Sequence, residues 1–278
     1  MDFVYRRSYR GPVKMVIFDW AGTTVDYGCY APAVVFVEVF KRFGVEITMD
    51  QARAPMGLQK NEHIKAISRL DDVDAAWRKK YGRACSDADV QAMFELFQPL
   101  QTKCIGDYAD IIPGTVETVN ELKRRGIKIG SSSGYFTEAM EINFKRAKDQ
   151  GYVPDTNSWA TAPGVPYGRP EPWMVLDNMR QARIFPPEAV VKIGDTKPDI
   201  SEGINAGTWA IGLAKTGNEV GLNEKEIAAL PKDVLARRVA KATDALAKMG
   251  AHYVVDEISQ VVPLIDEIEQ RLKWGDRP

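Results

Sequence analysis

The feature of this sequence that most restricts its fold is an alternation of short aliphatic runs with longer segments of helical period. The runs that read as strands are 13–19, 127–132, 189–195, 208–213 and 251–256. Apolar runs of this length, separated by amphipathic segments, are typical of a parallel sheet whose two faces are both covered. We therefore predict an α/β fold with a Rossmann-like parallel sheet as its core.

Between the first two of these strands the sequence carries only helical patterns, at 31–44 and from 48 to 104. An all-helical block of about 80 residues is thus inserted into the α/β domain. We predict a Rossmann-like catalytic core at 1–27 and 110–278, and an inserted helical cap domain at 28–109. The helices predicted in the block are 48–57, 58–70 and 86–104, the last with Ser86 as its cap.

The charge balance argues against a general attraction to nucleic acid or to acidic membranes. Lysine and arginine number 37 against 38 aspartates and glutamates, which gives a formal net charge of -1. A charged ligand must therefore be held by local geometry. No apolar run approaches the roughly 18 residues that a membrane span requires. We expect a small-molecule substrate, with no nucleic acid and no membrane as partner.

The cysteines and the N-terminal arm bear on location. Cys29, Cys85 and Cys104 have no CxxC spacing, which fits a reducing compartment better than a disulfide framework. The stretch 1–12 carries three arginines without the apolar run of a signal peptide. We predict a cytoplasmic protein whose N-terminal arm is a frayed or loosely docked tail.

Polar side chains end three of the predicted strands. Asp19 follows the first, serines 131–133 end the second, and Asp195 follows the third. Because the carboxyl ends of parallel strands converge, we expect these groups to meet there, together with Asp199 and with Arg169 from a loop. One aspartate after a strand is more often a helix cap, but four such groups together predict a site. Two carboxylates can hold Mg²⁺, while a serine and an arginine bind phosphoryl oxygens.

These segments resemble the four motifs of the haloacid dehalogenase superfamily. VIFDWAGTT is similar to the first motif, the Ser133 turn to the second, the Arg169 segment to the third and IGDTKPDI to the fourth. The resemblance covers nearly the whole chain, including the inserted cap. It implies that Asp19 is a nucleophile that takes up the phosphoryl group as an aspartyl phosphate, and that the fourth motif supplies carboxylates to Mg²⁺.

Ala21 departs from most phosphatases of that superfamily. Those enzymes carry a second aspartate two residues after the nucleophile, where it protonates an alkoxide leaving group. Alanine cannot do this, which argues against ordinary phosphate-ester hydrolysis. If a phosphorus–carbon bond is broken instead, the leaving group is a carbanion and needs an electron sink. The protonated imine that a lysine forms with an aldehyde is such a sink.

Lys60 is the candidate for this lysine. It follows the turn at 55–57 and precedes His63 by three residues, so the two side chains share one face of a helix. His63 could move protons while the imine forms, because its charge changes near neutral pH. By residue type alone, a helical lysine is more often a solvent-exposed side chain.

A closer resemblance favours the imine. FDWAGTTVDYGC, ARAPMGLQKNEH, SSSGY, GRPEPW and GDTKPDISEGINAG together resemble the phosphonoacetaldehyde hydrolase (phosphonatase) family. The resemblance implies a Mg²⁺-dependent hydrolase that forms acetaldehyde and phosphate, and a homodimer built through the cap. The residues that it implies are Lys60 for the Schiff base, Asp19 as nucleophile, His63 for proton transfer, Met56, Cys29, Ser133 and Arg169 around the substrate, and Asp19, the Ala21 carbonyl, Asp195 and Asp199 at Mg²⁺.

Some assignments stay open at this point. Any of serines 131–133 could contact phosphate. Gly134 and Tyr135 follow the second motif and are predicted substrate contacts, although Tyr135 fits equally well as a packing residue. His252 is predicted to be structural, and 224–250 to be helical with a solvated face.

Two other functions remain as alternatives. The first is a phosphomonoester phosphatase or phosphomutase of the same superfamily, in which Lys60 is only a phosphate or surface contact. The second is a phospho-acceptor or binding module that uses Asp19 and Mg²⁺ as a switch.

Overall fold

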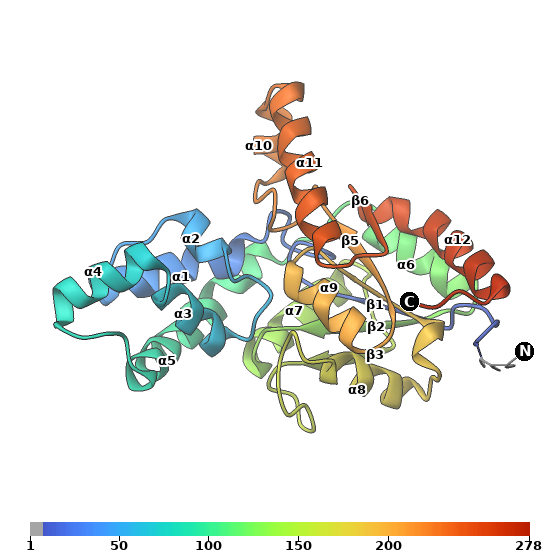
Figure 1. The fold of residues 1–278 in the computed structure, drawn as a ribbon, viewed down its shortest axis with the longest axis horizontal. Coiled ribbons are helices and arrows are strands. Elements are labelled where there is room, and N and C mark those ends of the chain that lie inside the picture. Colours follow the sequence, from blue (N-terminus) through green and yellow to red (C-terminus); the bar gives the residue numbers. More distant parts are fainter. Residues whose placement is uncertain (1–7) are drawn as a thin grey trace, which may run out of the picture.

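The computed structural model describes residues 8–278, which form a six-stranded sheet with every neighbouring pair parallel (Figure 1). The strand order β3-β2-β1-β4-β5-β6 places β1 at the point where the chain reverses the direction in which it adds strands. The predicted α/β fold with a Rossmann-like sheet is confirmed. The strands are β1 Met15–Phe18, β2 Lys128–Ser133, β3 Thr156–Trp159, β4 Val190–Gly194, β5 Trp209–Leu213 and β6 Tyr253–Val255.

Strand β1 is buried on both faces of the sheet. Met15 and Ile17 pack in one hydrophobic cluster with Val175 of helix α8 (Trp173–Ala182), while Val16 and Phe18 belong to the main core cluster. Successive side chains of a strand point to opposite faces, so this division means that both faces are covered. Each fully buried aliphatic or aromatic side chain contributes about 1.5–3 kcal/mol relative to exposure. The near-continuous apolar run of β1 follows from this double burial.

Helices from the two halves of the chain cover the sheet. α8 contacts β1, β2 and β3, α9 contacts β4 and β5, α11 contacts β5 and β6, and α6 contacts β2 with α12 packed against it. The helices that follow the helical block in the chain are α6 Thr115–Arg124, α7 Thr137–Asp149, α8 Trp173–Ala182, α9 Lys197–Asn205, α10 Glu224–Ala229, α11 Lys232–Lys248 and α12 Val261–Trp274. Short 3-10 turns occur at η1 Ile105–Tyr108, η2 Pro187–Ala189 and η3 Ile258–Gln260.

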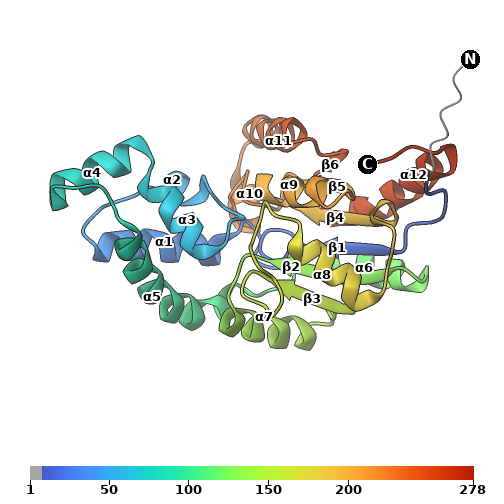
Figure 2. The same cartoon turned by 60° about the horizontal axis from the view of Figure 1, so that its bottom comes forward.

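Five further helices lie together beyond the end of the sheet where β1 and β2 finish (Figure 2). Two of them begin where the sequence predicted, because Thr48 and Ser86 each form a reciprocal capping box with the third residue of the helix. The helical block agrees with an inserted cap, and we keep its boundaries at 28 and 109 as a proposal. The helices are α1 Tyr30–Arg42, α2 Met49–Arg53, α3 Lys60–Ser68, α4 Asp71–Tyr81 and α5 Asp87–Cys104.

Several elements have no counterpart in the sequence prediction, among them strand β3 and helix α4. Strand β3 has the sequence TNSW, which lacks an aliphatic run, and it forms because it pairs with β2 and bonds Thr156 to Asn178 of α8 at 2.7 Å. Helix α4 is also additional. The segment 224–250 is helical and largely exposed, as predicted, but it divides into α10 and α11 at Leu230 and Pro231.

The N-terminal arm is described only from residue 8, so the predicted tail lies largely outside the described residues. The described part is docked: the Tyr9 hydroxyl donates to the Pro12 carbonyl, and the Val13 N–H donates to the Glu269 carboxylate. Within residues 8–278, no helix is both long enough and apolar enough to cross a bilayer.

Candidate active site

The site lies where β1 ends between β2 and β4. Asp19 follows β1, and its backbone is held on both sides, since its N–H donates to the Ile193 carbonyl at 2.9 Å and its carbonyl accepts from the Thr24 hydroxyl at 2.9 Å. Ser133 ends β2, and Asp195 follows β4. The predicted meeting of the strand ends is therefore observed.

Three buried carboxylates form the centre of this site. One oxygen each of Asp19, Asp195 and Asp199 lies within 4.8 Å of the others. Within residues 8–278, Asp195 accepts hydrogen bonds from neutral donors only, the Thr23 hydroxyl at 2.8 Å and the Asn218 N–H at 2.8 Å. Burial raises the pKa of Asp195 well above its usual value, and the charges of Asp19 and Asp199 raise it further.

This donor set fits a hard divalent cation. Carboxylate oxygens are the ligands that Mg²⁺ prefers, and burying several like charges is costly without a compensating cation. Burial likewise raises the pKa of Asp19, against the opposing effect of Arg169. Ala21, whose carbonyl is the fourth predicted ligand, lines the same small cavity as Asp19. The residues predicted for the metal thus lie together.

Asp199 also has a structural role. It forms a capping box with Thr196 at the start of α9, with the Thr196 hydroxyl donating at 2.5 Å. Its other oxygen accepts from Lys192 at 2.6 Å and lies 3.1 Å from the Arg169 guanidinium. Although burial alone would raise the pKa of Asp199, these two cations lower it. Asp199 therefore both caps the helix and holds two buried cations.

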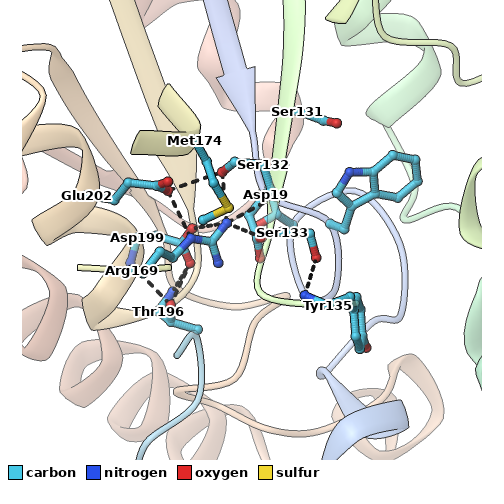
Figure 3. Close-up of polar contacts among 12 residues, drawn as sticks. Asp19, Ser131, Ser132, Ser133, Tyr135, Arg169, Met174, Thr196, Asp199 and Glu202 are labelled. Atoms are coloured by element: carbon cyan, nitrogen blue, oxygen red, sulfur yellow. Dashed lines mark hydrogen bonds and ion pairs between the residues drawn. The ribbon is translucent and has the colours of Figure 1, made fainter. Parts of the chain in front are cut away.

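Arg169 joins the acidic cluster to strand β2. Its Nη2 donates to Asp19 at 2.6 Å and to the Ser132 carbonyl at 3.0 Å, while its Nε donates to Glu202 at 2.9 Å (Figure 3). Its side chain is 1% exposed. An arginine fixed on three sides presents its donors in one orientation, which suits a planar or tetrahedral oxyanion beside Asp19.

Glu202 and Lys192 belong to the site but were missed from the sequence. Glu202 accepts from the Ser132 hydroxyl as well as from Arg169, and Lys192 bonds Asp199. Two signals were available. Lys192 is a cation inside an otherwise apolar strand, and Glu202 follows Asp199 by three residues on one helix, so the two carboxylates share a face.

The three serines point in different directions. The Ser131 hydroxyl donates to Asn157 at 2.6 Å and lies away from Arg169 in Figure 3. The Ser132 hydroxyl bonds Glu202 and accepts from Arg169 at 2.9 Å. Ser133 lines the cavity, and its oxygen accepts the Tyr135 N–H at 3.2 Å. Of the three, Ser133 is therefore the one positioned to contact a ligand in the cavity.

Lys60 faces this cavity from the first turn of α3. Its ammonium nitrogen lies 4.5 Å from the centroid of the Tyr135 ring and 5.8 Å from that of Phe36. Burial lowers the pKa of Lys60 from 10.5 to about 8. Three nearby titratable groups, Cys29, Asp19 and Asp26, act to raise the pKa of Lys60, and the Arg169 guanidinium acts to lower it.

Cap and core residues together line the cavity. Gly134 permits a close approach of the cap, because a Cβ at that position would lie 2.8 Å from the Leu58 carbonyl oxygen. Tyr135 lines the cavity, which favours the first of its two predicted roles. The residues of the cavity wall are Asp19, Ala21, Cys29, Pro32, Met56, Gly57, Lys60, Ser133, Gly134, Tyr135, Arg169 and Thr196.

The two histidines do not line this cavity. The His63 ring lies 3.9 Å from the Phe36 ring, and its Nε2 lies 2.8 Å from the Ala52 carbonyl oxygen. Burial and the charge of Lys60 lower the pKa of His63 well below its usual value. His252 accepts the Ala210 N–H and packs on Trp209, in agreement with its predicted structural role.

The chain is similar over nearly its whole length to known hydrolases. Residues 13–207 match the family model described as haloacid dehalogenase-like hydrolase. The chain is 44% identical over 276 residues to a phosphonoacetaldehyde hydrolase from Syntrophobacter fumaroxidans, covering 99% of each. It is 45% identical over 268 residues to one from Salmonella typhi, covering 96% of this chain and 99% of that one. The crystal structure of a phosphonoacetaldehyde hydrolase-like protein from Oleispira antarctica is 36% identical, with a TM-score of 0.96 and 100% of each chain covered.

Proposed function

Since this chain belongs to the phosphonoacetaldehyde hydrolase family of the haloacid dehalogenase superfamily, we propose that it hydrolyses the phosphorus–carbon bond of phosphonoacetaldehyde. The products are acetaldehyde and inorganic phosphate. The observation that carries the proposal is the presence of Lys60 and Asp19 in the wall of one small cavity. The amine of Lys60 can react with an aldehyde, and the carboxylate of Asp19 can accept a phosphoryl group.

The reaction begins with an imine at Lys60. Its pKa of about 8 leaves roughly one tenth of the amine unprotonated at pH 7, far more than for an ordinary lysine, and only the free amine attacks a carbonyl carbon. The nitrogen forms a bond to the aldehyde carbon, and the carbonyl oxygen leaves as water with one proton from the amine and one from solvent, so that a protonated imine results. The rings of Tyr135 and Phe36 face the Lys60 nitrogen, and such rings stabilise a cation above them.

Transfer of the phosphoryl group follows. A carboxylate oxygen of Asp19 attacks phosphorus, the phosphorus–carbon bond breaks, and its electron pair moves toward the imine nitrogen to give an enamine. Arg169 and Ser133 hold phosphoryl oxygens during this step. The enamine then takes a proton on carbon, one water releases acetaldehyde from Lys60, and a second water cleaves the aspartyl phosphate.

Mg²⁺ would be held by Asp19, the Ala21 carbonyl and Asp195, with Asp199 directly or through water. The fit rests on three buried carboxylates within 4.8 Å of one another. A divalent cation there would supply neutralising charge next to phosphoryl oxygens. Both hydrogen-bond donors to Asp195 in the described part of the chain are neutral, which supports this assignment.

Several roles stay predictions. Cys29, Met56, Gly134 and Tyr135 would contact the substrate, since all four line the cavity. Proton transfer by His63 would need a path past the Phe36 ring, against which the imidazole packs. The homodimer and the cytoplasmic location also remain predictions from the sequence.

The test compares phosphate release from phosphonoacetaldehyde with release from a panel of phosphate esters. We expect continuous turnover of phosphonoacetaldehyde and little release from the esters. Preferred hydrolysis of an ester would replace the proposal by the phosphatase alternative, and a single burst without turnover would favour the phospho-acceptor module. Borohydride reduction in the presence of phosphonoacetaldehyde should modify Lys60, and an unmodified Lys60 would eliminate the imine mechanism.

A further inference from the structure

The cap segment 53–60 is fixed to the core at both of its ends. It begins at Arg53, the last residue of α2, passes Met56, and reaches Lys60 at the start of α3. Arg53 contacts the core on one side of the cavity, and Gln59 contacts it on another. The Arg53 contact lies next to Asp195, and the Gln59 contact lies next to Arg169.

The Arg53 contact leads to Asp195. The guanidinium Nη1 donates to the carbonyls of Gly28 and Cys29 at 2.6 and 3.2 Å, and to the Asn218 side-chain oxygen at 3.3 Å. The Asn218 amide nitrogen donates back to the Arg53 carbonyl at 3.2 Å. Asn218 also donates its backbone N–H to Asp195 at 2.8 Å. Arg53 and Asn218 are 8% and 6% exposed, so this chain of contacts is buried.

The Gln59 contact leads to Arg169. The Gln59 side-chain oxygen accepts the Gly168 N–H at 3.1 Å, directly before Arg169 in the chain. The approach depends on glycine, because a Cβ at position 168 would lie 3.0 Å from both the Cβ and the side-chain oxygen of Gln59. Cap and core are thus in close contact beside the phosphoryl-binding arginine.

We propose that Arg53 and Gln59 are positioning residues that couple seating of the cap to the placement of Asp195 and Arg169. This inference rests on the proposed function for the reaction that the site performs. The contacts from which it is argued do not depend on that function. When the cap is seated, Arg53 fixes Asn218 and thereby one donor to Asp195, and Gln59 fixes the backbone next to Arg169. The complete site then exists only when the segment that leads to Lys60 is in place, which keeps phosphoryl transfer from starting in an open site.

The test of the Arg53 half measures Mg²⁺ binding to substrate-free protein by calorimetry. Arg53→Met and Asn218→Ala should each weaken Mg²⁺ binding by roughly tenfold, as expected when a buried charge-assisted contact is lost. Both substitutions break the same contact, the one between Arg53 and Asn218. The double variant should therefore bind Mg²⁺ no more weakly than the weaker of the two single variants. Arg69→Met, at an exposed position of the cap, is the matched control and should bind Mg²⁺ as the wild type does.

The test of the Gln59 half measures inorganic phosphate binding in the presence of Mg²⁺. Gln59→Leu should weaken it roughly tenfold and leave Mg²⁺ affinity unchanged, and Gln59→Glu should restore it because an acceptor oxygen is retained. Gln91→Leu is the control, since Gln91 is exposed and its side chain bonds Glu95 within the cap.

Unchanged Mg²⁺ affinity in Asn218→Ala, or additive losses in the double variant, would overturn the Arg53 half. Asn218→Ala carries this test by itself should Arg53→Met fail to fold. Unchanged phosphate affinity in Gln59→Leu would overturn the other half. Neither binding measurement uses the aldehyde, so the results are independent of whether the protein turns over phosphonoacetaldehyde. The proposed function is decided by that turnover alone.

Discussion

The buried ammonium of Lys60, to which we assign a catalytic role, should lower the free energy of unfolding of the protein. The residue is 7% exposed, and no ion pair or hydrogen bond to its ammonium group is found in the described chain. We therefore expect Lys60→Met, which keeps an unbranched side chain and removes the charge, to raise the free energy of unfolding at pH 7 while it abolishes turnover of phosphonoacetaldehyde.

The size of the effect follows from the pKa of Lys60. Burial lowers this pKa from 10.5 to about 8, which corresponds to about 3 kcal/mol of unfavourable free energy for the buried ammonium at neutral pH. This pKa is a net value, so any stabilisation of the ammonium by the rings of Tyr135 and Phe36 is not subtracted a second time. We expect a stabilisation of up to about 3 kcal/mol in Lys60→Met, or about 6–12 °C in Tm for a chain of this size.

The effect should depend on pH with a definite sign. Between about pH 8 and 10.5 the folded protein carries a neutral Lys60, whereas the unfolded chain carries a charged one. The unfolded state then binds more protons, so the free energy of unfolding of the wild type rises with pH across this window. The cost is fully present below pH 8 and disappears above 10.5. The difference between wild type and Lys60→Met should therefore shrink from pH 8 upward.

Urea unfolding of wild type and Lys60→Met at several pH values between 7 and 10 measures this difference. Lys79→Met is the matched control, because Lys79 is an exposed lysine of the same cap, and its effect should stay within about 0.5 kcal/mol. A variant less stable than the wild type at pH 7, or a difference that does not change with pH, would refute the account of Lys60 as a buried and partly neutral amine.

Four further outcomes are expected. The kcat/KM for phosphonoacetaldehyde should rise as pH increases and level off above about 8, because the free Lys60 amine attacks the aldehyde; a pH-rate profile checks this. Asp195→Asn should weaken Mg²⁺ binding by at least about tenfold in calorimetry, and chelation should remove activity that Mg²⁺ restores. Glu202→Gln should raise KM roughly tenfold with a smaller change in kcat, since Arg169 loses a charged partner; steady-state kinetics separate the two. Ala21→Asp should raise the pKa of Lys60 and move the kcat/KM profile toward alkaline pH by about one unit.

The strand ends could be predicted from the sequence because their signal is local. Asp19 and Asp195 each follow a short aliphatic run, and the topology of a parallel sheet then requires that such ends converge. Ser133 was one of three candidates for the same reason. Alternation along β2 separates Ser132 from the other two but leaves Ser131 and Ser133 on one face. Ser133 is the one that reaches the cavity because it is the last residue of the strand, whereas the Ser131 hydroxyl bonds Asn157 of β3.

Contacts between distant segments could not be predicted in this way. The partners Arg53 and Asn218 are 165 residues apart, and nothing near either residue in the sequence indicates the other. His63 illustrates a related limit. Its spacing from Lys60 places both on one helical face, but the packing of Phe36 from α1 determines which of the two reaches the cavity.

The alanine at position 21 also has an electrostatic consequence for Lys60. Position 21 lines the cavity that contains Lys60 and Asp19. An aspartate there would be useful for an alkoxide leaving group, since it could donate a proton. Beside Lys60, the same carboxylate would stabilise the ammonium form and oppose the burial that lowers the pKa of Lys60 to about 8. It would also add negative charge next to Asp19, whose pKa is already raised by burial. An acid at position 21 and a free amine at Lys60 are therefore in conflict, and under the proposed function the alanine favours imine chemistry over ester hydrolysis.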